Sequence, residues 1–167
     1  MNVDLLTYDE ETVPEELDGL GSYNHSYIQM ELGLQLRQRG DFTVLPELSL
    51  DVEQLDEQLR ASFKQEMKPD LAVYHGRPKP NFHKDILRMK EMPPLVIEVL
   101  SPTQSYRSLE QKIHAYFALG VQSCWIVAPM MKAMTVYHSA DQATTYGTGQ
   151  TVVDDVIGIE IPLSDIF

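Results

Sequence analysis

The stretch LVIEVL, residues 95–100, constrains the fold more than any other part of the chain. Five of its six residues are branched and apolar, and prolines stand on both sides of it. This pattern predicts a strand that is covered on both faces, in the interior of a sheet. Glu98 interrupts the pattern, although an ionised carboxylate costs several kcal/mol there unless it is paired or bound to a metal ion. From the strand alone, an ion pair or an edge position explains Glu98 as well as a functional site does.

Length and composition indicate a globular protein with one main domain. The chain has 167 residues, of which 43% are apolar, so it can form one substantial core. We expect an acidic N-terminal segment over residues 1–21 and a single domain over residues 22–167. The only cysteine, Cys124, excludes a disulfide framework, and its apolar neighbours predict a buried thiol. No apolar run reaches the ~18–20 residues of a membrane helix, and no Lys or Arg precedes Arg37, so we expect a cytoplasmic protein without membrane contact.

Two helices are predicted from apolar periodicity and end signals. The first covers residues 23–39, where apolar residues recur every four positions, and it ends at Gly40. The second begins at Ser108, an N-cap whose capping box Gln111 completes, and it stops at Gly120.

The strands are predicted from short apolar or alternating runs between turn residues. They lie around residues 42–52, 70–74, 95–100, 123–129, 133–139 and 143–152, with a short helical segment at 56–63, and the end of the chain, residues 156–167, is predicted to form a short strand and a closing turn. The resulting order of elements predicts an α/β or α+β fold in which helices flank a central mixed sheet.

Asp70 and Lys112 change the interpretation of Glu98. Asp70 begins the strand that precedes the LVIEVL strand, and Lys112 lies on the inward flank of the second helix. Each has an ordinary explanation, as a turn aspartate and as a lysine whose stem covers apolar surface. Together with Glu98 they also suit phosphodiester hydrolysis, because carboxylates bind Mg²⁺ and a lysine orients water or stabilises developing negative charge.

The same residues carry a resemblance to a known family. The chain reads KPDLAVY, then PPLVIEVLSP, then EQKIHAYFALGVQSCWIVAP. These runs resemble the PD-(D/E)xK nuclease superfamily and, within it, the restriction-endonuclease branch known as the Uma-two family. The resemblance covers residues 22–167 and implies a restriction-endonuclease-like fold. It also implies a Mg²⁺ site, with Mn²⁺ as a substitute, in which Asp70 and Glu98 bind the metal and Lys112 is the catalytic lysine.

The chain departs from the pattern of this family at several positions. Leu100 stands two residues after the glutamate, where the superfamily has its usual lysine, so Lys112 is the expected substitute. Ser108, Ser123 and Ala128 stand where the branch usually has acidic residues. These changes remove groups that would support the site, but they leave the two carboxylates and the lysine in place.

Three further residues are weaker candidates for the site. His25 matches a histidine that begins the first helix in this branch, although a capping or surface role is the simpler explanation. Glu31 on the first helix is a candidate carboxylate, although a solvent-facing position explains it more simply. Glu47 would approach Glu98 if the strands that carry them pair.

The charge distribution bears on how the chain could bind DNA. The net charge is −12, which argues against strong non-specific binding to nucleic acid. Between Lys64 and Lys90, however, seven basic residues outnumber three acidic ones, a local charge of +4. We expect Arg77, Lys79 and Lys84 to contact phosphates from a Pro-rich loop beside the site.

The leading hypothesis is therefore a Mg²⁺-dependent DNA endonuclease. The alternative from another class is a catalytically inactive member that keeps the fold as a binding or regulatory module. A third reading is a plain structural fold in which Glu98 forms an ion pair with Lys112. DNA is the expected partner, and a homodimer is left open.

Overall fold

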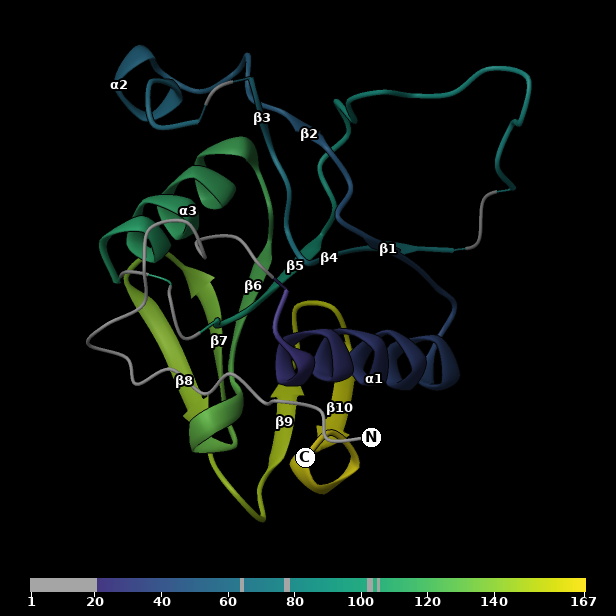
Figure 1. Cartoon of the computed structure of the whole chain (residues 1–167), viewed down its shortest axis with the longest axis vertical. Coiled ribbons are helices and arrows are strands. Elements are labelled where there is room, and N and C mark those ends of the chain that lie inside the picture. The colour runs from purple at the N-terminus through teal and green to yellow at the C-terminus, as the bar shows by residue number, and fades with distance from the viewer. Residues whose placement is uncertain (1–20, 64, 77–78, 102–103, 105) are drawn as a thin grey trace, which may run out of the picture.

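A mixed six-stranded sheet forms the centre of the molecule (Figure 1). The computed structural model describes residues 21–167 except 64, 77, 78, 102, 103 and 105. The strands are β1 (Phe42–Pro46), β2 (Leu50–Asp51), β3 (Glu66–Met67), β4 (Leu71–His75), β5 (Leu95–Val99), β6 (Ser123–Ala128), β7 (Ala133–Ser139), β8 (Gln142–Tyr146), β9 (Thr151–Asp154) and β10 (Ile159–Pro162). The helices are α1 (Tyr23–Arg39), α2 (Glu57–Arg60) and α3 (Tyr106–Leu119), with 3₁₀ turns η2 (Pro129–Met131) and η3 (Leu163–Asp165).

The central sheet has the order β1-β4-β5-β6-β7-β8. Strands β5 and β6 are parallel, whereas the other neighbours pair antiparallel. Helix α3 connects β5 to β6, as a parallel pair requires. The predicted mixed sheet flanked by helices is therefore confirmed, and the LVIEVL strand lies inside it with all of its described strand residues buried.

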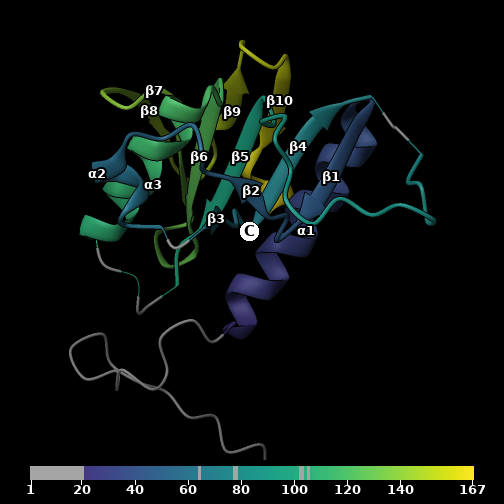
Figure 2. The ribbon, with the colours of Figure 1, turned by 90° about the horizontal axis from the view of Figure 1, so that it is seen from above.

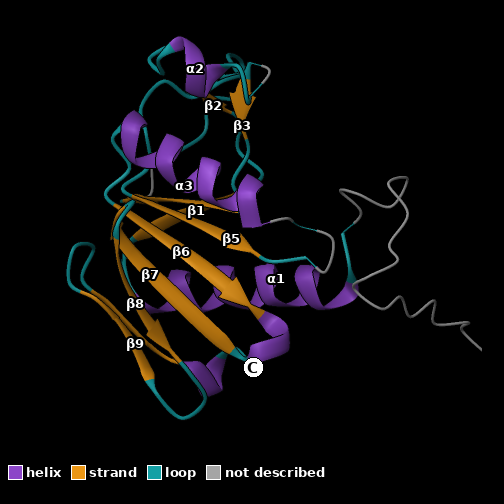
Figure 3. Ribbon diagram, turned by 90° about the vertical axis from the view of Figure 1, so that its left-hand side faces the viewer, coloured by secondary structure: helices purple, strands orange, loops and turns teal. Residues whose placement is uncertain are grey.

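The two faces of the sheet are covered by different elements (Figures 2 and 3). Leu95, Ile97 and Val99 pack in a core with α1 and the β9–β10 hairpin. Val96 lies in a second core with α3. Because side chains alternate along a strand, Glu98 also points to the α3 face.

The helix ends agree with the sequence in part. Helix α1 begins after Ser22, whose hydroxyl accepts a hydrogen bond from the His25 amide at 3.2 Å, and it ends at Gly40. Gly120 ends α3 with a φ of +98°, which a glycine adopts without steric cost. The predicted N-cap at Ser108 is wrong, because α3 already begins at Tyr106 and Ser108 lies inside its first turn.

Two of the predicted strands are each divided in the structure. The run 42–52 breaks into β1 and β2 because Pro46 has no amide hydrogen and Glu47 turns the chain with a φ of +50°. The run 143–152 breaks at a turn in which the Gln150 amide bonds the Gly147 carbonyl at 3.0 Å. Its two halves are β8, an edge of the central sheet, and β9, which pairs with β10.

Among the described residues, no helix has the length and apolar character needed to cross a membrane. Cys124 is buried in the α3-side core, as the sequence predicts. The acidic segment 1–21 lies outside the described residues except for Gly21.

Candidate functional site

The register of β4 and β5 places Asp70 opposite Glu98. Leu71 pairs with Ile97, and Asp70 and Glu98 are the next residues along the two antiparallel strands. Here a side chain, and not a backbone carbonyl, is the acceptor: Asp70 Oδ2 accepts a hydrogen bond from the Val99 amide at 2.6 Å. Two carboxylates that are distant in sequence therefore come from adjacent strands at the end of β5.

Helix α3 holds both oxygens of Glu98. Lys112 Nζ donates to Oε2 at 2.8 Å, and Tyr116 OH donates to Oε1 at 2.5 Å. The spacing of four residues places both donors on the same side of the helix. Glu98 is only 2% exposed, so its charge depends on these two partners.

The electrostatics of Glu98 follow from burial and its neighbours. Burial raises the pKa of Glu98, and the Lys112 ammonium opposes this rise, while the Asp70 carboxylate adds to it. Burial and the Glu98 carboxylate raise the pKa of Tyr116 well above its usual range, so its hydroxyl keeps its proton and stays a donor.

Helix α1 holds Asp70 from the other face of the sheet. His25 Nε2 lies 3.1 Å from Asp70 Oδ1, and Gln29 Nε2 donates to the Asp70 carbonyl at 2.8 Å. The hydrogen bond to Asp70 raises the pKa of His25, although burial opposes this rise. His25 Nδ1 is buried without a hydrogen-bond partner.

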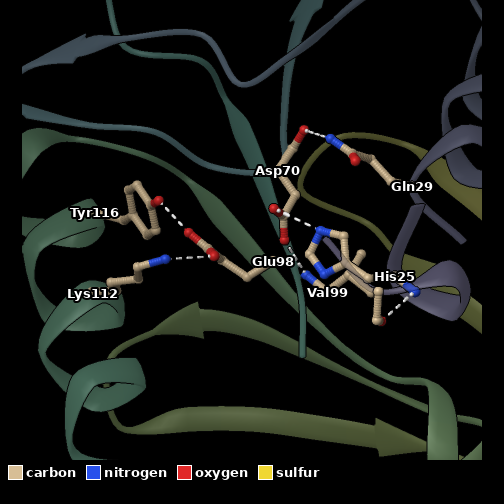
Figure 4. A network of polar contacts seen from close by, with 8 residues as sticks. His25, Gln29, Asp70, Glu98, Val99, Lys112 and Tyr116 are labelled. Atoms are coloured by element: carbon tan, nitrogen blue, oxygen red, sulfur yellow. Dashed lines mark hydrogen bonds and ion pairs between the residues drawn. The ribbon is translucent and has the colours of Figure 1, made fainter. Parts of the chain in front are cut away.

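These contacts join α1, β4, β5 and α3 in one polar network (Figure 4). The Asp70 carboxylate lies between Glu98 and His25, with Lys112 and Tyr116 on the far side of Glu98. Each of the four carboxylate oxygens of Asp70 and Glu98 has a hydrogen-bond or ion-pair partner in the protein. Two cavities of about 390 and 360 Å³ lie elsewhere on the described surface, with none of these residues in their walls.

The donor set partly fits a hard divalent cation. Carboxylate oxygens are the ligands that Mg²⁺ prefers, and each carboxylate can accept more hydrogen bonds or metal contacts than the two that it has here. The described residues contain no group of three or more His, Cys, Asp or Glu side chains arranged for a metal ion. Asp70 and Glu98 would therefore need water or substrate oxygens to complete a metal shell.

The two weaker carboxylate candidates lie outside the network. Glu31 accepts a hydrogen bond from Gln35 at 3.0 Å on α1. Glu47 is exposed, and only its backbone amide reaches the Asp70 carbonyl, at 3.2 Å. Its expected route to Glu98 is wrong, because β1 pairs with β4 and not with β5.

The basic loop does not lie beside the site, although the sequence suggested that it would. It leaves β4 at His75, the end of the strand opposite Asp70 (Figures 1 and 2). Lys79 and Lys84 are exposed in this loop, whereas Arg77 lies outside the described residues. Other cations of the basic window pair with neighbouring acids, through the ion pairs Lys68–Glu66, Arg88–Glu66 and Lys90–Glu53.

Sequence reasoning missed two residues of the network. Tyr116 is not among the site residues predicted from the sequence, although it stands four residues after Lys112. Gln29 stands four residues after His25, and that spacing was the one signal for it. Helical spacing from a candidate residue was therefore the available signal in both cases.

Comparisons with known proteins agree with this architecture. A crystal structure described as that of a putative nuclease belonging to DUF820, from Anabaena variabilis ATCC 29413, matches with a TM-score of 0.66 and 20% sequence identity. The match covers 87% of this chain and 81% of that chain, so the two share a fold, and the expected restriction-endonuclease-like fold is confirmed. No curated protein matches the chain. The family model Uma2, described as "Putative restriction endonuclease", matches residues 10–164, and the chain therefore belongs to the Uma2 family.

Proposed function

We propose that the protein is a Mg²⁺-dependent DNA endonuclease, with Asp70 and Glu98 as metal ligands and Lys112 beside the attacked phosphate. The observation that carries the proposal is that the buried Glu98 lies opposite Asp70 and accepts a hydrogen bond from Lys112 of α3. Membership of the Uma2 family and the fold shared with a protein described as a nuclease support it.

The chain's own residues supply most of the arrangement that this chemistry needs. A bound Mg²⁺ would polarise the phosphate and lower the pKa of a water molecule. Lys112 carries three N–H donors, of which one is bonded to Glu98. Its side chain is 30% exposed, so the remaining donors can reach a phosphate oxygen and stabilise developing charge. His25 and the Val99 amide fix the Asp70 carboxylate in place.

A cleavage assay combined with a metal-binding assay tests this proposal. Purified protein should nick or cleave plasmid DNA with Mg²⁺ or Mn²⁺, and Asp70→Asn or Glu98→Gln should abolish cleavage. Calorimetry with Mn²⁺ should show binding to the wild type that both variants lose. Glu31→Gln is the matched control, because it removes a carboxylate outside the network and should leave both readouts unchanged.

The outcomes separate the proposal from its rival. Cleavage by both variants at the wild-type rate would assign the activity to a contaminant or to another site. The observation that favours a catalytically inactive module is that every oxygen of the two carboxylates already has a protein partner. A well-folded wild type that neither binds Mn²⁺ nor cleaves DNA would establish that reading.

Lys79 and Lys84 remain candidates for DNA contact at a distance from the site. The five residues of β4 separate their loop from Asp70 by about 16 Å, which corresponds to roughly five base pairs of duplex. Replacing both lysines by Glu should weaken DNA binding, and each lost phosphate contact should reduce the log–log salt slope by about 0.9. Unchanged binding would mean that the loop is only solvated surface.

A further inference from the structure

Helix α1 is apolar on two opposite faces. One face is buried in the core through Ile28, Leu32 and Leu36. The other carries a row that we call the α1 stripe, in which the exposed fractions are 83% for Tyr23, 54% for Tyr27, 65% for Met30 and 46% for Leu34. With 3.6 residues per turn, the stripe lies about half a turn around the helix from the buried row. Apolar side chains gathered in this way mark an interaction site rather than scattered surface residues.

The spacing of the stripe indicates what covers it. Its residues are four, three and four positions apart, which is the spacing of the contact positions of a coiled coil. This spacing reads the same in both directions along the helix. We propose that α1 of one copy packs antiparallel against α1 of a second copy, so that Tyr23 faces Leu34 and Tyr27 faces Met30. Such a contact is self-complementary and closes as a two-fold dimer.

The flanks of the stripe suit close approach in this register. The small residues Ser26 and Gly33 lie along one side of the α1 stripe, and a Cβ at Gly33 would meet nothing within 4 Å. In the proposed register, Glu31 of one copy faces Ser26 of the other, so like charges do not meet. The rings of Tyr23 and Tyr27 already stack, with their centroids 6.5 Å apart, and present one continuous aromatic surface.

The charge of α1 is compatible with contact between two copies at this helix. The chain carries a net charge of −12, so two copies repel each other over most of their surfaces. Helix α1 contains one acidic residue, Glu31, and two basic ones, Arg37 and Arg39. Its net charge is +1, like that of α3, whereas the net charge of α2 is zero, so α1 does not add to the acidic excess that keeps two copies apart.

The exposed area sets the expected strength of the contact. A tyrosine that is fully buried removes about 200 Å² from water, so Tyr23 and Tyr27 together offer about 270 Å² per copy. With Met30, Leu34 and the flanking residues, two copies would bury roughly 1,000 Å², near the lower end of specific interfaces. We therefore expect a reversible dimer that forms as the protein concentration rises.

Sedimentation velocity of the full chain tests the proposal. The wild type should shift from monomer to dimer between micromolar and near-millimolar concentrations, and Met30→Glu should weaken association at least about 30-fold, because it places a charge in the apolar contact. Gln58→Glu, which adds the same charge on the exposed face of α2, should associate like the wild type. Circular dichroism shows whether each variant is folded.

Cysteine pairs test the register independently. Tyr23→Cys combined with Leu34→Cys should form disulfides between chains, whereas Tyr23→Cys alone should not, because its two copies lie about 16 Å apart across the two-fold axis. Cys124 is fully buried and does not compete.

Three results would overturn the proposal, and none of them depends on nuclease activity. These are a wild type that stays monomeric throughout, a folded Met30→Glu variant that dimerises normally, and cross-linking by Tyr23→Cys alone. A monomeric wild type would leave residues 1–20 of the same chain, or another protein, as the occupant of the stripe.

Discussion

Replacing Lys112 by Met should destabilise the fold through Glu98. Removing one partner of a fully buried ion pair costs about 3–5 kcal/mol, because it leaves the other charge uncompensated. Here the Lys112 side chain is 30% exposed, so water screens part of the interaction, and Tyr116 still donates to Glu98. We therefore expect the free energy of unfolding to fall by about 2 kcal/mol near neutral pH.

The pH dependence of this loss identifies its cause. Burial raises the pKa of Glu98, and Lys112 opposes the rise, so the variant has a still higher Glu98 pKa. A carboxyl whose pKa is raised by folding contributes stability that is present below its unfolded pKa and is lost as pH rises through its folded pKa. The variant should therefore lose more stability than the wild type as pH rises. The difference between the two should shrink toward about pH 4, where Glu98 is protonated in both.

Urea unfolding, followed by the fluorescence of the buried Trp125 at several pH values, measures the free energy of unfolding and its dependence on pH. Lys84→Met is the matched control, because it removes an exposed lysine, and it should change stability by less than about 0.5 kcal/mol. Glu98→Gln in the Lys112→Met background should recover part of the loss, since no buried charge then remains unpaired. A loss that is equal at about pH 5 and about pH 8 would refute the electrostatic explanation.

Two further predictions concern other polar contacts. The hydrogen bond to Asp70 raises the pKa of His25 above its usual value of 6.5, so this contact stabilises the fold below about pH 6.5 and is lost as pH rises through the folded pKa. His25→Gln should therefore cost more unfolding free energy near pH 5.5 than near pH 8.5, and a pH-independent cost in urea titrations would contradict this. Asp154 is fully buried and accepts the Trp125 indole N–H at 2.7 Å among other donors. Asp154→Ala should lower the unfolding free energy by about 3 kcal/mol, and a loss below about 1 kcal/mol in the same assay would mean that those donors find other partners.

The regular parts of the fold could be predicted because their signals are local. Four-residue apolar spacing located α1, and an apolar run between prolines located β5. The breaks were harder, because Glu47 adopts a positive φ that its side chain does not favour. The start of α3 was misplaced for a related reason, since a good capping pattern at Ser108 does not exclude a helix that begins earlier.

Part of the candidate site could be predicted as a set of residues, whereas its geometry could not. Glu98 stands out because a carboxylate conflicts with an apolar strand, and Lys112 because it lies on the inward flank of its helix. Asp70 stands out only together with these two residues. Their contacts depend on the register of β4 against β5 and on the rotation of α3, which no local pattern specifies. Tyr116 was missed because an apolar helix face explains a buried tyrosine equally well.

The strand register also explains how the site keeps a lysine although position 100 is a leucine. Alternation along β5 places residue 100 on the same face of the sheet as Glu98, and the Leu100 amide still bonds the Val127 carbonyl of β6 at 2.8 Å. Leu100 accordingly packs against the α3-side core. Lys112 enters that same face from α3 and reaches Glu98 at 2.8 Å. Helix α3 therefore places the Lys112 ammonium group on the face of the sheet where a lysine at position 100 would lie. For this reason the leucine at position 100 does not by itself argue against the proposed function.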